Sequence, residues 1–301
     1  MQDAFLFFVT ALIWGSTWLA ITFQLGTVSP EASIVYRFAL AALILAVFAW
    51  VRRLPMRFSL RQHAFIALQG TFLFSINYIL VYLAELYLPS GLVAIIFSTI
   101  IITNVLFGAL FLGNPVRPRV VAGALIGMAG LAMVFWPQLR GLDFSGTVVL
   151  GLLFSFGSLI SASLGNILSA RNQRNGLPVV QTNAFGMAYG ALVTLAIALV
   201  RGATFGFEPT GSYIFSLLYL SVFGSVIAFG SYLTLIGRLG VDRAAYVMVV
   251  FPLVALALST LYEGLGWSTL AFAGVGLVIL GNVLALRRRR RPPTDPAQAS
   301  S

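Results

Sequence analysis

Long apolar runs recur along almost the whole chain, and this feature constrains the fold most strongly. Each run is about 20 residues long, which is the length that an α-helix needs to cross the hydrocarbon core of a bilayer. Pro, Gly and charged residues cluster in the short gaps between the runs. We therefore expect an all-α integral membrane protein whose ten transmembrane helices cover residues 4–24, 31–50, 63–86, 90–112, 119–136, 147–168, 179–200, 213–236, 244–263 and 267–286.

The balance of apolar and charged residues points the same way. Hydrophobic residues make up 59% of the chain and charged residues only 9%, whereas soluble domains carry about 25% charged residues. A soluble protein of this length would need a polar shell that so few charges cannot supply. Lipid is therefore the expected solvent for most of the surface, and a multi-pass protein of a bacterial inner membrane is the expected class.

The arginines predict how the helices are oriented. All 18 basic residues are Arg, and with the N-terminus inside the cell 15 of them fall in inner segments. Outer segments hold only Arg140 and Arg201, while Arg37 lies within the second helix. This asymmetry follows the positive-inside rule and predicts that both termini are cytoplasmic. Residues 287–301, which begin with five arginines, are expected to form a basic cytoplasmic tail at the anionic inner leaflet rather than a nucleic-acid site.

Several kinds of chemistry lack the residues that they need. The chain has no Lys, so a Walker-type nucleotide loop is not encoded. It has no Cys and a single His, His63, which leaves no thiolate metal site and no nucleophile beside a base. We therefore predict that the protein is not an enzyme and uses no cofactor or metal.

The two halves of the chain resemble each other at a shift of about 150 residues, the mark of an internal repeat. The matching features, in the same order in both halves, are Trp14-Gly15-Ser16 with Phe156-Gly157-Ser158, Pro30 with Pro178, and Gly123 and Gly130 with Gly274 and Gly281. We predict a first five-helix repeat over residues 1–136 and a second over 147–286. Because five is odd, the second repeat is inverted, and inverted repeats are typical of secondary transporters that work by alternating access.

These features resemble the EamA-type permeases of the drug/metabolite transporter superfamily. The resemblance rests on the inverted repeat, on the aromatic-Gly-Ser of each half and on Glu263-Gly264 after the ninth helix. Within the family, the chain is most similar to the aromatic amino acid exporters. The resemblance implies a central cavity built from helices one, three, four, six, eight and nine, and the export of small solutes, amino acids among them. One departure is Asn114-Pro115, where the family often has Glu-Pro.

Polar and aromatic side chains inside predicted spans are candidates for the transport site, because buried polar groups in lipid must pair or face a cavity. The substrate-binding candidates are Trp14, Ser16, Asn77, Tyr78, Tyr82, Thr99, Thr103, Ser158 and Tyr246. Pro252 is a candidate hinge, since it leaves the Met248 carbonyl without its helical partner. The structural alternatives are a simple kink at Pro252 and Ser or Thr bonds to carbonyls one turn back.

The expected substrate is neutral or zwitterionic with an apolar body, because rings stack on rings and an ammonium can sit over a ring face. Helix one has no mid-span carboxylate, which disfavours a proton antiporter built on a central Glu. Arg37 has three possible roles: holding a substrate carboxylate, pairing with Glu85, or snorkelling to the interface; we favour the last two. Other metabolites or drugs remain alternative substrates, and a channel is the alternative class. The expected partners are the solute and the bilayer, for a monomer that binds no nucleic acid.

Overall fold

The computed structural model describes residues 1–24, 26, 28–88, 90–140, 146–263 and 268–286, and all regular elements within these residues are helical. Some predicted features lie outside the described residues. They are the break at Pro89, Gly264, the start of the last predicted helix at 267, and the basic tail 287–301.

The helices of the first half follow the predicted runs closely. A π-helical segment, η1, joins α3 and α4 without a break, so the third predicted helix is continuous. The elements are α1 (Gln2–Thr22), α2 (Pro30–Val51), α3 (Leu60–Gly70), η1 (Thr71–Ile76), α4 (Asn77–Glu85), α5 (Ser90–Ser98), α6 (Ile100–Leu112), α7 (Pro118–Val134) and α8 (Trp136–Arg140).

The second half has the same plan. Its third helix also contains a π-helical segment, η2, between two α-helical segments. The elements are α9 (Gly146–Arg174), α10 (Val179–Val200), α11 (Gly211–Tyr219), η2 (Leu220–Ile227), α12 (Ala228–Leu239), α13 (Val241–Ala244), α14 (Val247–Glu263) and α15 (Thr269–Leu286).

Residues in the polar gaps start and stop these helices. The Ser29 hydroxyl accepts a hydrogen bond from the Ala32 amide at 3.3 Å, and Pro30 occupies the first turn of α2. A capping box between Ser59 and Gln62 starts α3. Gly113 ends α6 with φ of 64°, a left-handed conformation that favours glycine. Local capping therefore places the helix ends near the predicted breaks.

By length and composition, six helices in the described part of the chain could cross a membrane: Pro30–Val51, Leu60–Glu85, Ile95–Leu112, Gly146–Arg174, Val179–Val200 and Gly211–Leu239. Pro118–Val134 and Thr269–Ala285 are shorter apolar helices. Many large apolar side chains on these helices are exposed, including Trp50, Leu110 and Val200. Such a surface suits lipid rather than water. The chain is thus an all-helical membrane protein.

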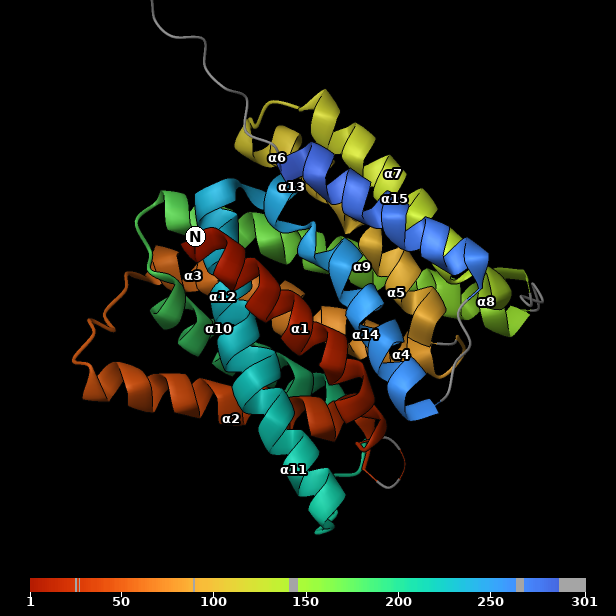
Figure 1. Ribbon diagram of the computed structural model, residues 1–301. Coiled ribbons are helices and arrows are strands. Elements are labelled where there is room, and N and C mark those ends of the chain that lie inside the picture. Colours follow the sequence, from red (N-terminus) through yellow and green to blue (C-terminus); the bar gives the residue numbers. More distant parts are fainter. Residues whose placement is uncertain (25, 27, 89, 141–145, 264–267, 287–301) are drawn as a thin grey trace, which may run out of the picture.

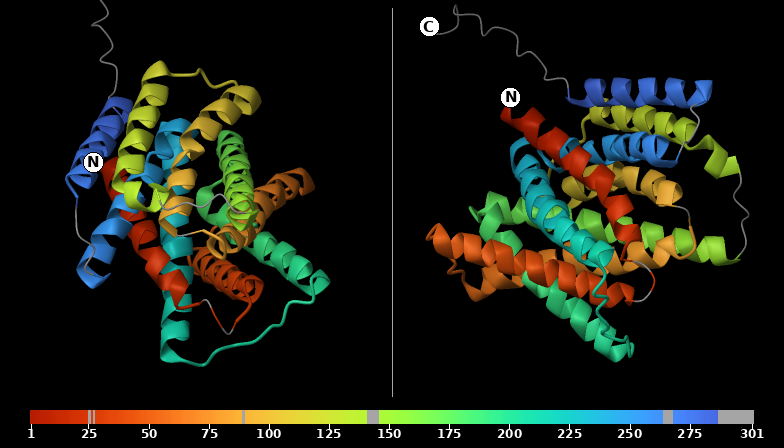
Figure 2. Two further views of the ribbon diagram at one scale, coloured as in Figure 1. Left: turned by 90° about the vertical axis from the view of Figure 1, so that its right-hand side faces the viewer. Right: turned by 60° about the horizontal axis from the view of Figure 1, so that its bottom comes forward.

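The helices form two flanks around a central group. α7 and α15 pack antiparallel along one flank, and α2 packs on α10 along the opposite flank (Figures 1 and 2). Between the flanks, α1 contacts α12 and α14, while α9 contacts α4 and α6. This central group surrounds the cavity described below.

Glycines allow the closest helix contacts. A Cβ on Gly123 would lie 2.6 Å from the Gly281 carbonyl oxygen, and a Cβ on Gly130 would lie 2.5 Å from that of Gly274. These distances are too short for any side chain, so α7 and α15 touch through their backbones. Gly186 meets Gly70 in the same way on the other flank. The Gly-x-x-x-Gly sequences 123–127 of α7 and 186–190 of α10 are therefore packing surfaces.

Some boundaries differ from the predictions. The sixth predicted helix, 147–168, continues to Arg174, although its last residues are polar. Two of these residues bond to neighbouring helices: the buried Asn172 donates to the Gln69 side-chain oxygen at 2.9 Å, and the half-buried Gln173 donates to the Leu233 carbonyl at 2.8 Å. A prediction from hydropathy places the end of a helix where the sequence becomes polar. Hydrogen bonds to other helices extend α9 beyond that point.

Charged residues gather at the two ends of the bundle. At one end, Arg238 pairs with Asp3 at 3.1 Å, close to the N-terminus, which lies at the same end as the last turn of α15 (Figure 1). At the other end, Arg201 pairs with Glu31 at 2.8 Å. Segments with predicted inner and outer arginines therefore lie at opposite ends.

Candidate functional site

A cavity lies in the central group, and its empty space together with the open space at its mouth is about 660 Å³. Several helices contribute residues to the cavity wall. The wall is mostly apolar, with aromatic rings from five helices and a few polar groups. It includes Trp14 and Thr17 of α1, Arg37 of α2, Asn77 and Tyr78 of α4, Phe97 of α5, Asn166 of α9, Phe229 and Tyr232 of α12, and Met248 and Phe251 of α14.

Four aromatic rings form one face of the cavity. The ring of Trp14 lies 5.0 Å from those of Phe229 and Tyr232, and Tyr78 lies 6.3 Å from Phe229. The Trp14 indole N–H donates to the Gly224 carbonyl at 3.1 Å. The ring contacts and the hydrogen bond hold these side chains in place. The face is therefore a fixed surface on which an apolar group can stack.

Asn77 supplies a polar group whose nitrogen and oxygen each make one hydrogen bond within the protein. Its Nδ2 donates to the Leu73 carbonyl at 3.2 Å, and its Oδ1 accepts from the Ser158 hydroxyl at 2.8 Å. Ser158 is fully buried and is not part of the cavity wall. Of these two predicted site residues, Asn77 therefore lines the cavity and Ser158 holds it in place.

Asn166 lies on the wall with one unused group. Its Nδ2 donates to the Tyr232 hydroxyl at 3.1 Å, whereas its Oδ1 is buried without a hydrogen-bond partner. Neither Asn166 nor Tyr232 was among the predicted site residues. Their polarity within apolar helices was a signal in the sequence, but polarity alone did not separate them from residues that bond locally.

Among the described residues of this wall, Arg37 is the only charged one, and it is 1% exposed. Its Nε donates to the Ser225 hydroxyl at 2.9 Å and its Nη2 to the Tyr78 hydroxyl at 3.4 Å. The two favoured predictions for Arg37 are wrong. It is too buried to snorkel, and no described ion pair joins it to Glu85. Stacking and hydrogen bonds hold the guanidinium inside the bundle.

Besides Ser158, five more of the predicted substrate-binding residues are not on the cavity wall: Ser16, Tyr82, Thr99, Thr103 and Tyr246. The two threonines bond to carbonyls of their own turns, Thr99 to Ile96 and Thr103 to Ile100. Their placement follows the local alternative, because this bond satisfies a hydroxyl without any cavity.

Ser16 and Tyr82 are placed by packing between helices. The Ser16 hydroxyl bonds to the Ile13 carbonyl and to the Tyr219 hydroxyl of α11. Tyr82 is 1% exposed, and its hydroxyl has no hydrogen-bond partner. Both side chains lie between helices rather than at the cavity, a difference that helical periodicity alone does not resolve.

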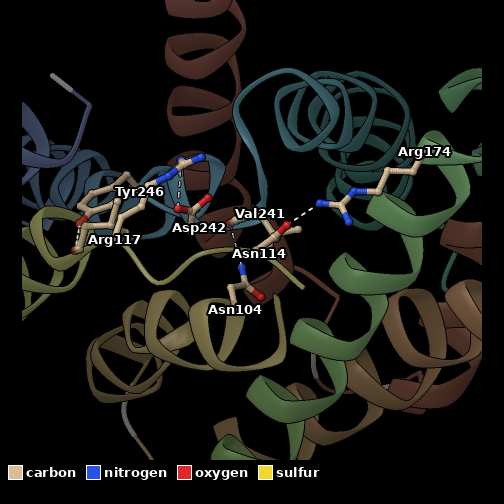
Figure 3. A network of polar contacts seen from close by, with 8 residues as sticks. Asn104, Asn114, Arg117, Arg174, Val241, Asp242 and Tyr246 are labelled. Atoms are coloured by element: carbon tan, nitrogen blue, oxygen red, sulfur yellow. Dashed lines mark hydrogen bonds and ion pairs between the residues drawn. The ribbon is translucent and has the colours of Figure 1, made fainter. Parts of the chain in front are cut away.

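Tyr246 belongs to a polar network at the end of the bundle that holds Asp3 (Figure 3). Its hydroxyl donates to the Val120 carbonyl, which ties the start of α14 to α7. Nearby, Asn104 of α6 donates to the Val241 carbonyl at 3.3 Å and so holds α13. Tyr246 is therefore placed as a link between helices.

The same network includes Asn114 of Asn114-Pro115, where the family often has Glu-Pro. The Asn114 side-chain oxygen accepts a hydrogen bond from Arg174 at the end of α9 (Figure 3). Arg117 pairs with Asp242 at 3.3 Å. These residues line a second, polar cleft with about 940 Å³ of empty space. Asn114 thus links the end of α6 to the end of α9.

Pro252 lies in the second turn of α14, directly after Phe251 and four residues after Met248, which both line the cavity wall. Gly15 of α1 comes so close that a Cβ there would lie 2.9 Å from the Phe251 carbonyl oxygen. The helix interruption by proline therefore lies beside the cavity, at the contact between α1 and α14.

Comparisons with known proteins agree with this architecture. A model described as the EamA-like transporter family matches residues 2–136 and again residues 149–287. A solved crystal structure superposes with a TM-score of 0.78, at 20% identity, over 94% of this chain and 96% of that chain, which shows a shared fold.

Curated relatives match nearly full length. Protein PagO of Salmonella typhimurium is 28% identical over 98% of this chain and 96% of its own. The uncharacterized inner membrane transporter YedA of Escherichia coli K12 is 29% identical, over 97% of this chain and 93% of its own. A probable amino-acid metabolite efflux pump of the same strain is 23% identical, over 96% and 97%.

Proposed function

We propose, from the premise that this chain belongs to the EamA-like transporter family, that it exports small solutes, including amino acids with aromatic side chains, by alternating access. The family lies within the drug/metabolite transporter superfamily, and the chain is a multi-pass transporter of the bacterial inner membrane. The substrate class and the direction of transport are the parts that we propose.

The aromatic face of the cavity carries this proposal. Trp14, Tyr78, Phe229 and Tyr232 offer a stacking surface in the centre of the bundle, while Asn166 offers an unused hydrogen-bond acceptor. The ring of an aromatic amino acid can stack on this surface, and its ammonium group can donate a hydrogen bond to Asn166. The similarity to a probable amino-acid metabolite efflux pump supports the same substrate class.

Alternating access would follow from an inverted repeat, and three observations support one. The family model matches the chain twice. Each half carries a π-helical segment in its third helix, at Thr71–Ile76 and Leu220–Ile227. The third observation concerns α7 and α15 and is the most specific.

Contacts between α7 and α15 obey the symmetry that a repeat implies. A shift that brings Gly123 onto Gly274 also brings Gly130 onto Gly281. The observed contacts are Gly123 with Gly281 and Gly130 with Gly274, so the shift exchanges one contact for the other. A two-fold relation between the halves has this property, because each residue contacts the copy of its partner.

We also propose ten crossings with both termini in the cytoplasm. The crossings would be α1, α2, α3 to α4, α5 to α6, α7, α9, α10, α11 to α12, α14 and α15. Two ion pairs support this topology, because Arg238 lies with Asp3 at one end and Arg201 lies with Glu31 at the other. The positive-inside rule then makes the first end cytoplasmic.

Uptake by proteoliposomes tests the substrate class. Purified protein would be reconstituted and offered labelled Phe, Trp, Tyr, Leu, a cationic drug and a nucleotide sugar, with and without a pH gradient. We expect saturable exchange of the aromatic amino acids and little transport of the cation or the nucleotide sugar. Transport of the drug with none of the amino acids would overturn the proposed substrate class.

A further inference from the structure

We propose that Arg37 is a carboxylate-binding site in the central cavity, so that the transported solutes are organic carboxylates with an apolar body. The inference deepens the proposed function and rests on it, because it identifies the part of the substrate that the cavity holds most strongly. It also differs from the roles that the sequence favoured for Arg37.

The burial of Arg37 is the first step. A guanidinium that is 1% exposed has lost its hydration, and burying such a cation is costly unless an anion compensates it. The three ion pairs among the described side chains lie at the ends of the bundle, and none includes Arg37. The charge in the cavity wall therefore lacks a counter-ion from the described protein, and an anionic ligand would provide one.

Hydrogen-bond accounting shows which part of the guanidinium is available. Ser225 donates its own proton to the Leu220 carbonyl, so its oxygen is an acceptor for the Nε–H of Arg37. Nη2 reaches the Tyr78 hydroxyl, whereas Nη1 is buried without any hydrogen-bond partner. A guanidinium has five N–H donors. The unused donors suit a carboxylate, whose two oxygens accept parallel hydrogen bonds.

The neighbours of Arg37 fix its orientation. Its guanidinium carbon lies 4.8 Å from the centre of the Tyr78 ring and 5.3 Å from that of Phe38. A Cβ on Gly224 would lie 3.1 Å from Nη2 and 3.0 Å from the Thr17 side chain, so the missing side chain makes room for the guanidinium. A donor held in place before binding loses little entropy when a ligand arrives.

The rest of the cavity defines the other end of the ligand. Tyr78 contacts Arg37 and also belongs to the aromatic face that includes Phe229 and Trp14. A carboxylate on Arg37 therefore places the body of its ligand beside those rings. Small inorganic anions would leave the apolar wall unfilled, and organic cations would meet a like charge.

Three related probes separate the charged groups of the ligand: L-phenylalanine, 3-phenylpropanoate, which lacks the ammonium, and 2-phenylethylamine, which lacks the carboxylate. Equilibrium binding would be measured on the purified full-length protein. We expect both carboxylates to bind at least about tenfold more tightly than the amine, since hydrogen bonds to charged groups contribute about 1.5–3 kcal/mol and each 1.4 kcal/mol is tenfold. An amine that binds as tightly as both carboxylates would overturn the proposal.

Variants assign this preference to Arg37. In Arg37→Gln we expect both carboxylates to bind at least about tenfold more weakly and the amine to bind no more weakly than before. Arg37→Lys keeps the charge but loses the planar fork, so we expect a smaller loss for the carboxylates alone. The matched control is Arg201→Gln, which removes an equal charge outside the cavity and should leave all three affinities unchanged. Unchanged carboxylate affinities in both Arg37 variants would contradict the proposal.

The outcomes also separate this inference from the proposed function. If 3-phenylpropanoate binds through Arg37 while no amino acid is transported, the carboxylate site stands and the proposed substrate class fails. If amino acids are transported but binding is indifferent to Arg37, the carboxylate site fails and the proposed function stands. Failure of every carboxylate probe to bind would overturn the site. If Arg37→Gln does not fold, Arg37→Lys alone decides, and equal affinity with the wild type for all three probes would then count against the site.

Discussion

Trp14 shows how one side chain can combine packing and recognition. Its indole contacts two other rings and donates to a backbone carbonyl, while one face lines the cavity. We expect Trp14→Ala to raise the KM for L-phenylalanine exchange about two- to tenfold, since an aromatic pair contributes about 0.5–1.5 kcal/mol. The control is Trp50→Ala, because Trp50 is 79% exposed on α2 and lies outside the cavity. Equal KM values for both variants would remove Trp14 from the site.

Ser158 makes a different kind of contribution, through the residue that it supports. Its hydroxyl is the hydrogen-bond donor to the buried Oδ1 of Asn77. Ser158→Ala leaves that oxygen unpaired, so we expect the protein to lose about 1–3 kcal/mol of stability, measured by denaturant unfolding in detergent. Thr103→Ala removes only a bond within its own turn and should change stability by less than about 0.5 kcal/mol. If Ser158→Ala lost as little stability as Thr103→Ala, the result would show that the Asn77 oxygen has another hydrogen-bond partner.

At the residue scale, the sequence could identify candidates but not sort them. Trp14, Asn77 and Tyr78 were predicted and line the cavity, whereas Thr99 was predicted and bonds within its own helix. A helix position gives polarity and approximate depth, but small rotations decide whether a side chain faces a cavity or a neighbouring helix. The role of Arg37 was predicted wrongly because its hydrogen-bond partners lie on other helices, far away in the sequence.

The α7 and α15 pair tests packing at the element scale. A Cβ on Gly274 would lie 2.5 Å from the Gly130 carbonyl oxygen, so Gly274→Ala must push the helices apart. We expect a loss of about 1–3 kcal/mol, as for other overpacked contacts, with a lower melting temperature. Gly276→Ala on the same helix is the matched control, because nothing lies within 4 Å of its Cβ position. Equal melting temperatures for the two variants would show that the helices do not touch here.

Helix positions were largely predictable from apolar periodicity and breakers, and α10 has the bounds that the sequence indicated. The π-helical segments were not predicted, because their residues are mostly apolar like the α-helical residues on either side, and hydropathy does not distinguish the two kinds of helix. The break at Thr99 also escaped prediction, since apolar residues surround it on both sides. Such interruptions depend on contacts between helices.

At the scale of the whole molecule, the topology is testable with tags. Epitopes added to the two termini of the protein should both be protected from added protease in spheroplasts, whose outer membrane has been opened, because the arginine distribution predicts a cytoplasmic location for each. An external loop tag near Arg201 is the positive control for cleavage. Cleavage at one terminus but not the other would imply an odd number of crossings, which a duplicated plan of five and five does not permit.

The central claim is that one cavity is reached from each side of the membrane in turn. Counterflow measures this most directly: proteoliposomes loaded with unlabelled L-phenylalanine are diluted into a trace of labelled L-phenylalanine without any ion gradient. A carrier predicts a transient accumulation of label above equilibrium, saturable and weakened in Trp14→Ala. Label that rises to equilibrium without an overshoot, at a rate proportional to concentration, would indicate a pore and contradict the account.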